Sequence, residues 1–299
     1  MFHTFDELRQ KVRHFPNRKR VAVVAAAEEH VLEAIVRAER EQIIEPILIG
    51  EAVNITAQLD RLGAEIPTSA IRPAESVSEA AMLAVNLVRS GEADFLMKGR
   101  LQTAELMRVV VDRTHGLRTR RLMSHIAFLQ IPTYHKLLAI TDGGIVLYPD
   151  LEEKREILEN AVQFMLKMGY ARPNVAVLTA VETINPKMQD TVDAARLKQL
   201  NQTGMIANCV VEGPISYDLA MNKESAKIKG YDSPVTGDVD LMIAPNIAAG
   251  NLMAKSLVYS AGAAMAGVVV GAAVPVVLTS RGSTAEEKFY SLVLAASAG

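Results

Sequence analysis

Short runs of apolar and β-branched residues alternate with longer segments of helical periodicity along most of the chain. The runs lie at residues 20–27, 46–50, 94–97, 137–141, 175–179, 208–212, 241–244 and from 268 onward. Helical patterns separate them, for example at residues 28–42, 77–90 and 150–168. Strands that are apolar on both faces and joined by helices form parallel sheets covered on both sides. We therefore predict an α/β fold.

The length of 299 residues exceeds what one hydrophobic core usually serves, so one large domain or two smaller ones are expected. No Gly/Ser linker or internal repeat marks a boundary, and a break at residues 132–138 is the favoured position. Hydrophobic residues make up 49% and charged residues 22%, which excludes a disordered, collagen-like or coiled-coil chain. A net charge of −2 gives no general attraction to nucleic acid or to anionic membranes.

Residues 257–280 carry no charge and are long enough to span a bilayer. The β-branched runs, glycines and Pro275 in this stretch instead favour a buried helix at 259–266 followed by a buried parallel strand. The first 20 residues lack the apolar core of a secretory signal. The single Cys209 excludes a disulfide framework and is expected to pack in a strand rather than act as a nucleophile. We expect a cytoplasmic protein without membrane segments.

Ligands of open α/β sheets bind beyond the carboxyl ends of the strands, so the loops there carry the candidate chemistry. After the last strand, Ser280, Arg281 and Gly282 lead into a helix that begins with Glu286 and Glu287. A guanidinium and the N–H groups of a helix start are suited to a phosphate. The same pattern also fits an ordinary helix cap by Ser283 or Thr284 with Glu286 or Glu287 as its partner.

A second basic turn, Lys98-Gly99-Arg100, follows the strand at 94–97 and leads to Thr103. It suits an anion, or it is a solvated turn with Thr103 as the helix cap; the spacing excludes a P-loop. The basic stretch that contains Arg118 is either a solvated face or an attraction for a polyanionic thioester.

Two acidic pairs raise the question of a divalent metal: Asp238 with Asp240, and Asp190 with Asp193. Neither has a third carboxylate nearby in sequence, and the histidines lack zinc-ligand spacing. No metal site is predicted.

Five ordered sequence motifs resemble the phosphate acetyl/butyryl transferase family over nearly the full length. They lie at residues 139–154, 180–193, 212–218, 237–255 and 277–281. The compact length and the opening strand look more like the butyryl branch of the family than the acetyl branch.

The resemblance implies a fold similar to isocitrate and isopropylmalate dehydrogenases, with two α/β domains and the site in the cleft between them. The first domain would comprise residues 1–137 plus 267–299, and the inserted second domain residues 138–266. The implied reaction transfers an acyl group reversibly between coenzyme A and inorganic phosphate. Coenzyme A would be a substrate, no cofactor would be tightly bound, and the usual assembly would be a homodimer.

Ser280 and Arg281 match the family's catalytic serine–arginine pair, and Glu287 matches its carboxylate. Relatives often carry an acidic residue where this chain has Ser283. The candidate substrate-binding residues are Lys98, Gly99, Thr103, Arg118, Ser124, Asn246, Asn251 and Lys255.

These residue types suit the chemistry, because an arginine binds phosphate through two donors and a serine stabilises negative charge as it develops. A Glu287 base would have to take a proton from a thiol with an unperturbed pKa of about 8.5, so it needs a desolvated site. No activated Cys or Ser–His pair is apparent, which favours direct transfer between bound substrates. The alternatives are a metal-dependent oxidoreductase of the same fold and a non-catalytic protein that binds coenzyme A or an acyl phosphate.

Overall fold

A computed structural model describes residues 1–280 and 282–298, which pack as two compact units. The flanking unit comprises Phe5–Arg121 and the chain from Ala266 onward. The central unit comprises Leu122–Met265 and the short segment Met1–Thr4. The predicted division put the first boundary later, at residue 137, and as a statement about domains it stays a prediction.

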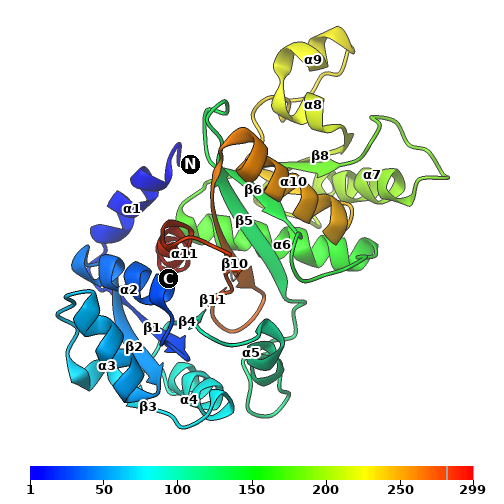
Figure 1. Ribbon diagram of the computed structural model, residues 1–299. Coiled ribbons are helices and arrows are strands. Elements are labelled where there is room, and N and C mark those ends of the chain that lie inside the picture. The colour runs from blue at the N-terminus through cyan, green and yellow to red at the C-terminus, as the bar shows by residue number, and fades with distance from the viewer. Residues whose placement is uncertain (281, 299) are drawn as a thin grey trace. The chain divides into compact units, whose positions relative to one another are not determined.

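The flanking unit is a sheet with helices on both faces (Figure 1). Its strands are β1 (Lys19–Val24), β2 (Ile44–Gly50), β3 (Ile71–Pro73), β4 (Phe95–Lys98), β10 (Ala264–Val270) and β11 (Val276–Val277). Its helices are α1 (Phe5–Arg13), α2 (Glu29–Arg40), α3 (Ala52–Arg61), α4 (Val77–Arg89), α5 (Thr103–Val110) and α11 (Ala285–Ser297), with a 3-10 turn at Thr68–Ala70.

The strand order in the flanking unit is β3-β2-β1-β4-β11-β10. All neighbouring pairs are parallel except β10 and β11, which are antiparallel. The strand predicted from residue 268 onward corresponds to β10 and was expected to be parallel to its neighbours. This prediction is wrong, because β10 runs antiparallel to β11. The reason is the connection from Val270 to Val276, which is too short for the crossover that parallel strands need.

The central unit is also built from strands and helices that alternate along the chain. Its strands are β5 (Ser124–Gln130), β6 (Leu138–Thr141), β7 (Asn174–Leu178), β8 (Val210–Ile215) and β9 (Leu241–Ile243), in the order β5-β6-β9-β7-β8. Its helices are α6 (Leu151–Met168), α7 (Gln189–Gln202), α8 (Tyr217–Met221), α9 (Lys223–Ile228) and α10 (Ile247–Ala261). The pair β5–β6 is antiparallel and the others are parallel. The predicted α/β class with mostly parallel strands is confirmed.

The uncharged stretch at 257–280 is divided among three elements. Helix α10 stops at Ala261, where Gly262 takes a left-handed conformation with φ 68°, and β10 begins at Ala264. The predicted helix at 259–266 is thus wrong beyond Ala261, because the glycine ends it. Within the described chain, no helix combines the length and the apolar character needed to cross a membrane.

Helices α2 and α11 pack against each other although they come from opposite ends of the chain (Figure 1). The guanidinium of Arg37 on α2 lies 3.7 Å from the ring centre of Phe289 on α11. A cation over an aromatic face adds to the apolar packing of the two helices. This contact connects α11 to the helix that begins just after β1.

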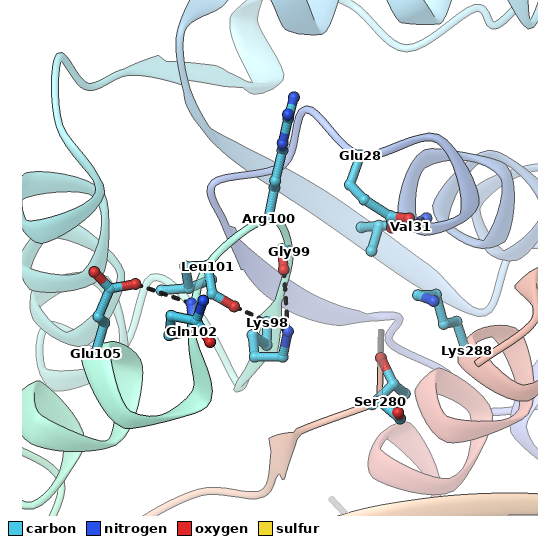
Figure 2. A pocket seen from close by; sticks show the side chains of 11 residues that line it. Glu28, Val31, Lys98, Gly99, Arg100, Leu101, Gln102, Glu105, Ser280 and Lys288 are labelled. Carbon is cyan, nitrogen blue, oxygen red and sulfur yellow. Dashed lines mark hydrogen bonds between the residues drawn. The ribbon is translucent and has the colours of Figure 1, made fainter. Parts of the chain in front are cut away.

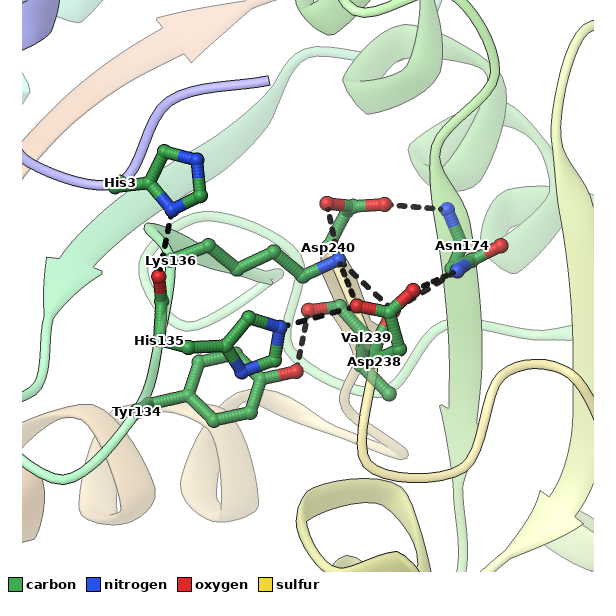
Figure 3. A network of polar contacts seen from close by, with 8 residues as sticks. All are labelled: His3, Tyr134, His135, Lys136, Asn174, Asp238, Val239 and Asp240. Carbon is green, nitrogen blue, oxygen red and sulfur yellow. Dashed lines mark hydrogen bonds and ion pairs between the residues drawn. The ribbon is translucent and has the colours of Figure 1, made fainter.

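A buried lysine neutralises the acidic pair Asp238 and Asp240 in the central unit. The ammonium of Lys136, only 1% exposed, lies 2.8 Å from Asp240 Oδ1 and 3.0 Å from Asp238 Oδ1 (Figure 3). Burial alone would raise the pKa of Asp238, but hydrogen bonds from Lys136 and His135 hold that pKa below its usual value. These aspartates therefore join the strand β9 to the loop before β6.

We predict that Lys136→Met destabilises the central unit by about 3–5 kcal/mol, because it leaves the buried Asp240 carboxylate without its cation and removes a partner of the half-buried Asp238. Urea unfolding followed by circular dichroism measures the loss. Lys229→Met serves as the control, since it removes a lysine from exposed ion pairs with Glu182 and Asp218 and should leave the midpoint near that of the wild type. Equal midpoints for the two variants would contradict the importance of this buried network.

Candidate active site

A pocket of about 550 Å³ opens at the carboxyl ends of β4 and β11 in the flanking unit (Figure 2). Its lining comes from three loops that follow strands and from the first turns of three helices. The lining residues are Glu28, Val31, Lys98, Gly99, Arg100, Leu101, Gln102, Glu105, Thr279, Ser280 and Lys288. Two of the loops, at 98–102 and at 279–280, are those in which the sequence analysis expects an anion.

The turn after β4 is held against the end of β1 by backbone contacts. The Gly99 amide donates to Val24 O at 2.8 Å, and the Arg100 amide donates to Ala25 O at 2.8 Å. A Cβ at position 99 would lie 2.3 Å from Ala25 O, so the close approach requires glycine. Gly99 thus has a structural role that the sequence analysis did not assign to it.

Lys98 is buried at 6% exposure and its ammonium lies within its own turn. Nζ donates to Leu101 O at 3.1 Å and to Gly99 O at 3.3 Å (Figure 2). The solvated basic turn considered for this segment is therefore wrong for Lys98, although Arg100 is exposed. The predicted cap is also wrong: Gln102, not Thr103, precedes α5, and its amide donates to the Glu105 carboxylate at 2.9 Å.

The segment between β11 and α11 contains the predicted catalytic residues. Ser280 is exposed at the pocket, and its carbonyl accepts the Ser283 amide at 3.1 Å. Arg281, the predicted phosphate ligand, lies outside the described residues. Thr284 caps α11 by accepting the Glu287 amide at 3.2 Å, so the capping interpretation of this segment is confirmed for Thr284.

Ser283 connects Glu287 and Lys288. Its buried hydroxyl donates to Glu287 Oε1 at 2.7 Å, and its carbonyl accepts Lys288 Nζ at 2.7 Å. Lys288 is 3% exposed and lines the pocket, although it is not among the predicted site residues. Its position in the sequence could have indicated burial, because Lys288 belongs to a helix in which Phe289, Ser291 and Leu292 are also buried.

Both carboxylates of the pocket lining are hydrogen-bonded at helix starts. Glu28 accepts the Val31 amide at 2.7 Å, and Glu105 accepts the Gln102 amide at 2.9 Å. Carboxylates at helix N-termini are stabilised by the helix dipole. The cations Lys98, Arg100 and Lys288 complete the charged lining.

Thr103 and Arg118 are exposed in the flanking unit and do not line this pocket.

Four other predicted binding residues belong to the central unit. Ser124 is buried and accepts from Asn160, and the Asn246 side chain caps α10. Asn251 donates to Gly143 O at 3.0 Å, and Lys255 is exposed on α10 near Tyr259. Their predicted roles in binding stay predictions.

Two of the sequence motifs meet inside the central unit through an ion pair. Lys154 of the motif at 139–154 lies 2.6 Å from Asp193 of the motif at 180–193, and both side chains are buried. Asp193 is thereby paired with a lysine rather than placed beside Asp190 for a cation.

Cys209 is buried in the same unit, and burial raises its pKa to about 11. A thiol with that pKa is a poor nucleophile near neutral pH.

Residues 68–296 match the family described as phosphate acetyl/butaryl transferase. The chain belongs to this family. It is 43% identical to the phosphate acetyltransferase of Thermotoga maritima over 93% of this chain and 94% of that protein. It is 40% identical to the phosphate butyryltransferase of Clostridium acetobutylicum over 99% of this chain and 98% of that protein.

A solved structure of a branched-chain phosphotransacylase from Enterococcus faecalis superposes with a TM-score of 0.80 at 31% identity, covering 93% of this chain and 97% of that one. The family resemblance inferred from the motifs is confirmed. The similar identities to an acetyl and a butyryl transferase leave the expected preference for the butyryl branch a prediction.

We predict that Gly99→Ala lowers the melting temperature and weakens activity, because the added Cβ must push the turn off the β1 carbonyls. Overpacking of this kind costs about 1–3 kcal/mol. Differential scanning calorimetry and a steady-state assay measure both effects. Gly282→Ala is the stability control, because a Cβ at position 282 meets nothing within 4 Å. Gly63 also has open space, but its positive φ of 56° would add backbone strain to an alanine variant. A Gly99→Ala protein as stable as wild type would contradict the packing argument.

Proposed function

We propose that this chain catalyses reversible transfer of a short-chain acyl group between a coenzyme A thioester and inorganic phosphate. Membership of the phosphate acetyl/butaryl transferase family is the observation that carries this conclusion. The pocket supports it, because two buried lysines and the Ser280 hydroxyl line one small space at the ends of parallel strands. Coenzyme A and phosphate would both be substrates.

In the proposed reaction, phosphate attacks the thioester carbonyl and the carbon–sulfur bond breaks, which yields acyl phosphate and the thiol of coenzyme A. Arg281 would bind the phosphate through two donors. Ser280 would donate a hydrogen bond to the oxygen that becomes negative, a contribution worth about 10²–10³ in rate at comparable sites. In the reverse direction Glu287 would accept the proton of the thiol.

The family resemblance implies an acid at position 283, where this chain has Ser283, whose hydroxyl donates to Glu287. An acid there would place a second carboxylate beside Glu287, whereas the serine holds the carboxylate by a hydrogen bond. This contact supports Glu287 rather than residue 283 as the proton acceptor.

We further propose the architecture of the isocitrate and isopropylmalate dehydrogenases, with residues 1–137 plus 267–299 as one domain and 138–266 as the other. A homodimer or a higher homo-oligomer is the proposed assembly. Lys98, Arg118 and Lys255 are the proposed candidates for binding the coenzyme A thioester. The other proposed substrate-binding residues are Gly99, Thr103, Ser124, Asn246 and Asn251.

Release of thiol from acetyl-CoA and from butyryl-CoA, measured with and without phosphate, tests the function. Phosphate-dependent release is expected with at least one substrate, and the ratio of kcat/KM values identifies the acyl chain. No phosphate-dependent release with either thioester would overturn the proposal in favour of a non-catalytic binding protein.

We predict that Arg281→Ala raises the KM for phosphate and lowers kcat, because the variant loses a bidentate cation for phosphate. Initial rates at varied phosphate and fixed butyryl-CoA measure both constants. Arg61→Ala, at an exposed position at the end of α3, is the charge control and should leave both constants near wild type. Unchanged phosphate kinetics in Arg281→Ala would remove this residue from the site.

We predict that Cys209→Ala retains wild-type turnover, since the Cys209 thiol is buried and its pKa is raised to about 11. The same thiol-release assay, with the fold checked by circular dichroism, provides the measurement. A folded but inactive variant would require an acyl-enzyme and exclude direct transfer.

A further inference from the structure

Lys288 has an unusual environment for a buried cation. It is 3% exposed at the fourth residue of α11, and its ammonium carries three N–H donors. Ser283 O, at 2.7 Å, is the one hydrogen-bond acceptor that the described residues provide for Nζ. No carboxylate among those residues forms an ion pair with it.

The two other deeply buried lysines with charged partners show what this environment lacks. Lys136 is paired with Asp238 and Asp240, and Lys154 is paired with Asp193. Burying an ammonium is unfavourable unless a counter-charge or several hydrogen bonds compensate it. Among the described residues, Lys288 has a single carbonyl, so an anion in the adjoining pocket would supply the missing compensation.

The pocket around Lys288 fits a small phosphoryl group. In Figure 2 the amine of Lys288 is directed toward the space between the Gly99 turn and Ser280. Lys98 lines the same space, and the nearby carboxylates Glu28 and Glu105 accept hydrogen bonds from backbone amides at helix starts. Ammonium groups bind phosphate oxygens through short charge-assisted hydrogen bonds.

We propose that Lys288 binds the transferred phosphoryl group, which is inorganic phosphate in one direction and the phosphate of the acyl phosphate in the other. This inference rests on the proposed function and assigns a ligand that the sequence motifs did not indicate. Lys288 is a binding residue in this scheme, while Ser283 fixes its ammonium through the backbone carbonyl.

Lys288→Met tests the assignment, because methionine is similar in length but has no charge or donor. The KM for phosphate is expected to rise about 10–100-fold, the range for the loss of one charge-assisted hydrogen bond. The KM for butyryl-CoA, measured at saturating phosphate, should change less than about threefold. Lys288→Arg retains a charged donor and should keep the phosphate KM closer to that of the wild type.

Lys19→Met is the matched control, since Lys19 begins β1 and therefore lies at the opposite end of the strand from the pocket. Its kinetic constants should equal those of the wild type. Melting curves with and without inorganic phosphate add a binding readout, in which phosphate should stabilise the wild type and Lys19→Met but not Lys288→Met.

Three results would overturn the assignment. The first is an unchanged phosphate KM in Lys288→Met. The second is a lower kcat together with an equal rise in both KM values, which indicates a structural role. The third is a rise in the KM for the coenzyme A substrate alone. The last result would place a phosphate group of coenzyme A on Lys288. Should Lys288→Met fail to fold, the comparison of Lys288→Arg with Lys288→Gln replaces it. Failure of the proposed function itself is distinguishable, because it would be seen as absent acyl transfer in the wild type.

Discussion

The close backbone contact between the ends of β1 and β4 is the constraint on which the candidate site depends. Along the sheet of the flanking unit, β2 and β3 lie on one side of β1, whereas β4 and β11 lie on the other. The loops after β1 and β4 therefore separate toward opposite faces at this point, which is where open α/β sheets bind ligands. Gly99 lets the two strand ends approach, and Lys98, Arg100 and Ser280 are positioned around the gap.

The sequence was informative about elements that obey one simple pattern. The apolar runs at 20–27, 46–50 and 241–244 correspond to β1, β2 and β9, and the amphipathic segment at 150–168 corresponds to α6. Strand direction was harder, because β10 and β11 are apolar runs like the parallel strands, and only the length of their connection distinguishes them. The strand β5 escaped prediction because Ser124, His125 and Gln130 at its ends leave an apolar run of only residues 126–129.

Site residues that follow from their position after a strand could be predicted, whereas those that depend on tertiary contacts could not. Loops after strands identified Lys98 and Ser280, since the carboxyl ends of parallel strands meet at one edge. Lys288 was missed because the apolar residues of α11 indicate only a buried face, whereas the importance of Lys288 depends on the contact of its ammonium with Ser283, which the sequence does not give. Thr103 was misassigned because Gln102 is an uncommon helix cap, made effective here by Glu105.

The order of the chain has a consequence for biosynthesis. The sheet of the flanking unit combines β1 to β4 with β10 and β11, and α11 remains buried through Ser297 beside α2. Ser280, Glu287 and Lys288 are thus synthesised long after Lys98 and Gly99. A nascent chain that ends before residue 280 has Lys98 and Gly99 but no second wall opposite them. The pocket can therefore be completed only once α11 has been synthesised and packs onto strands made much earlier.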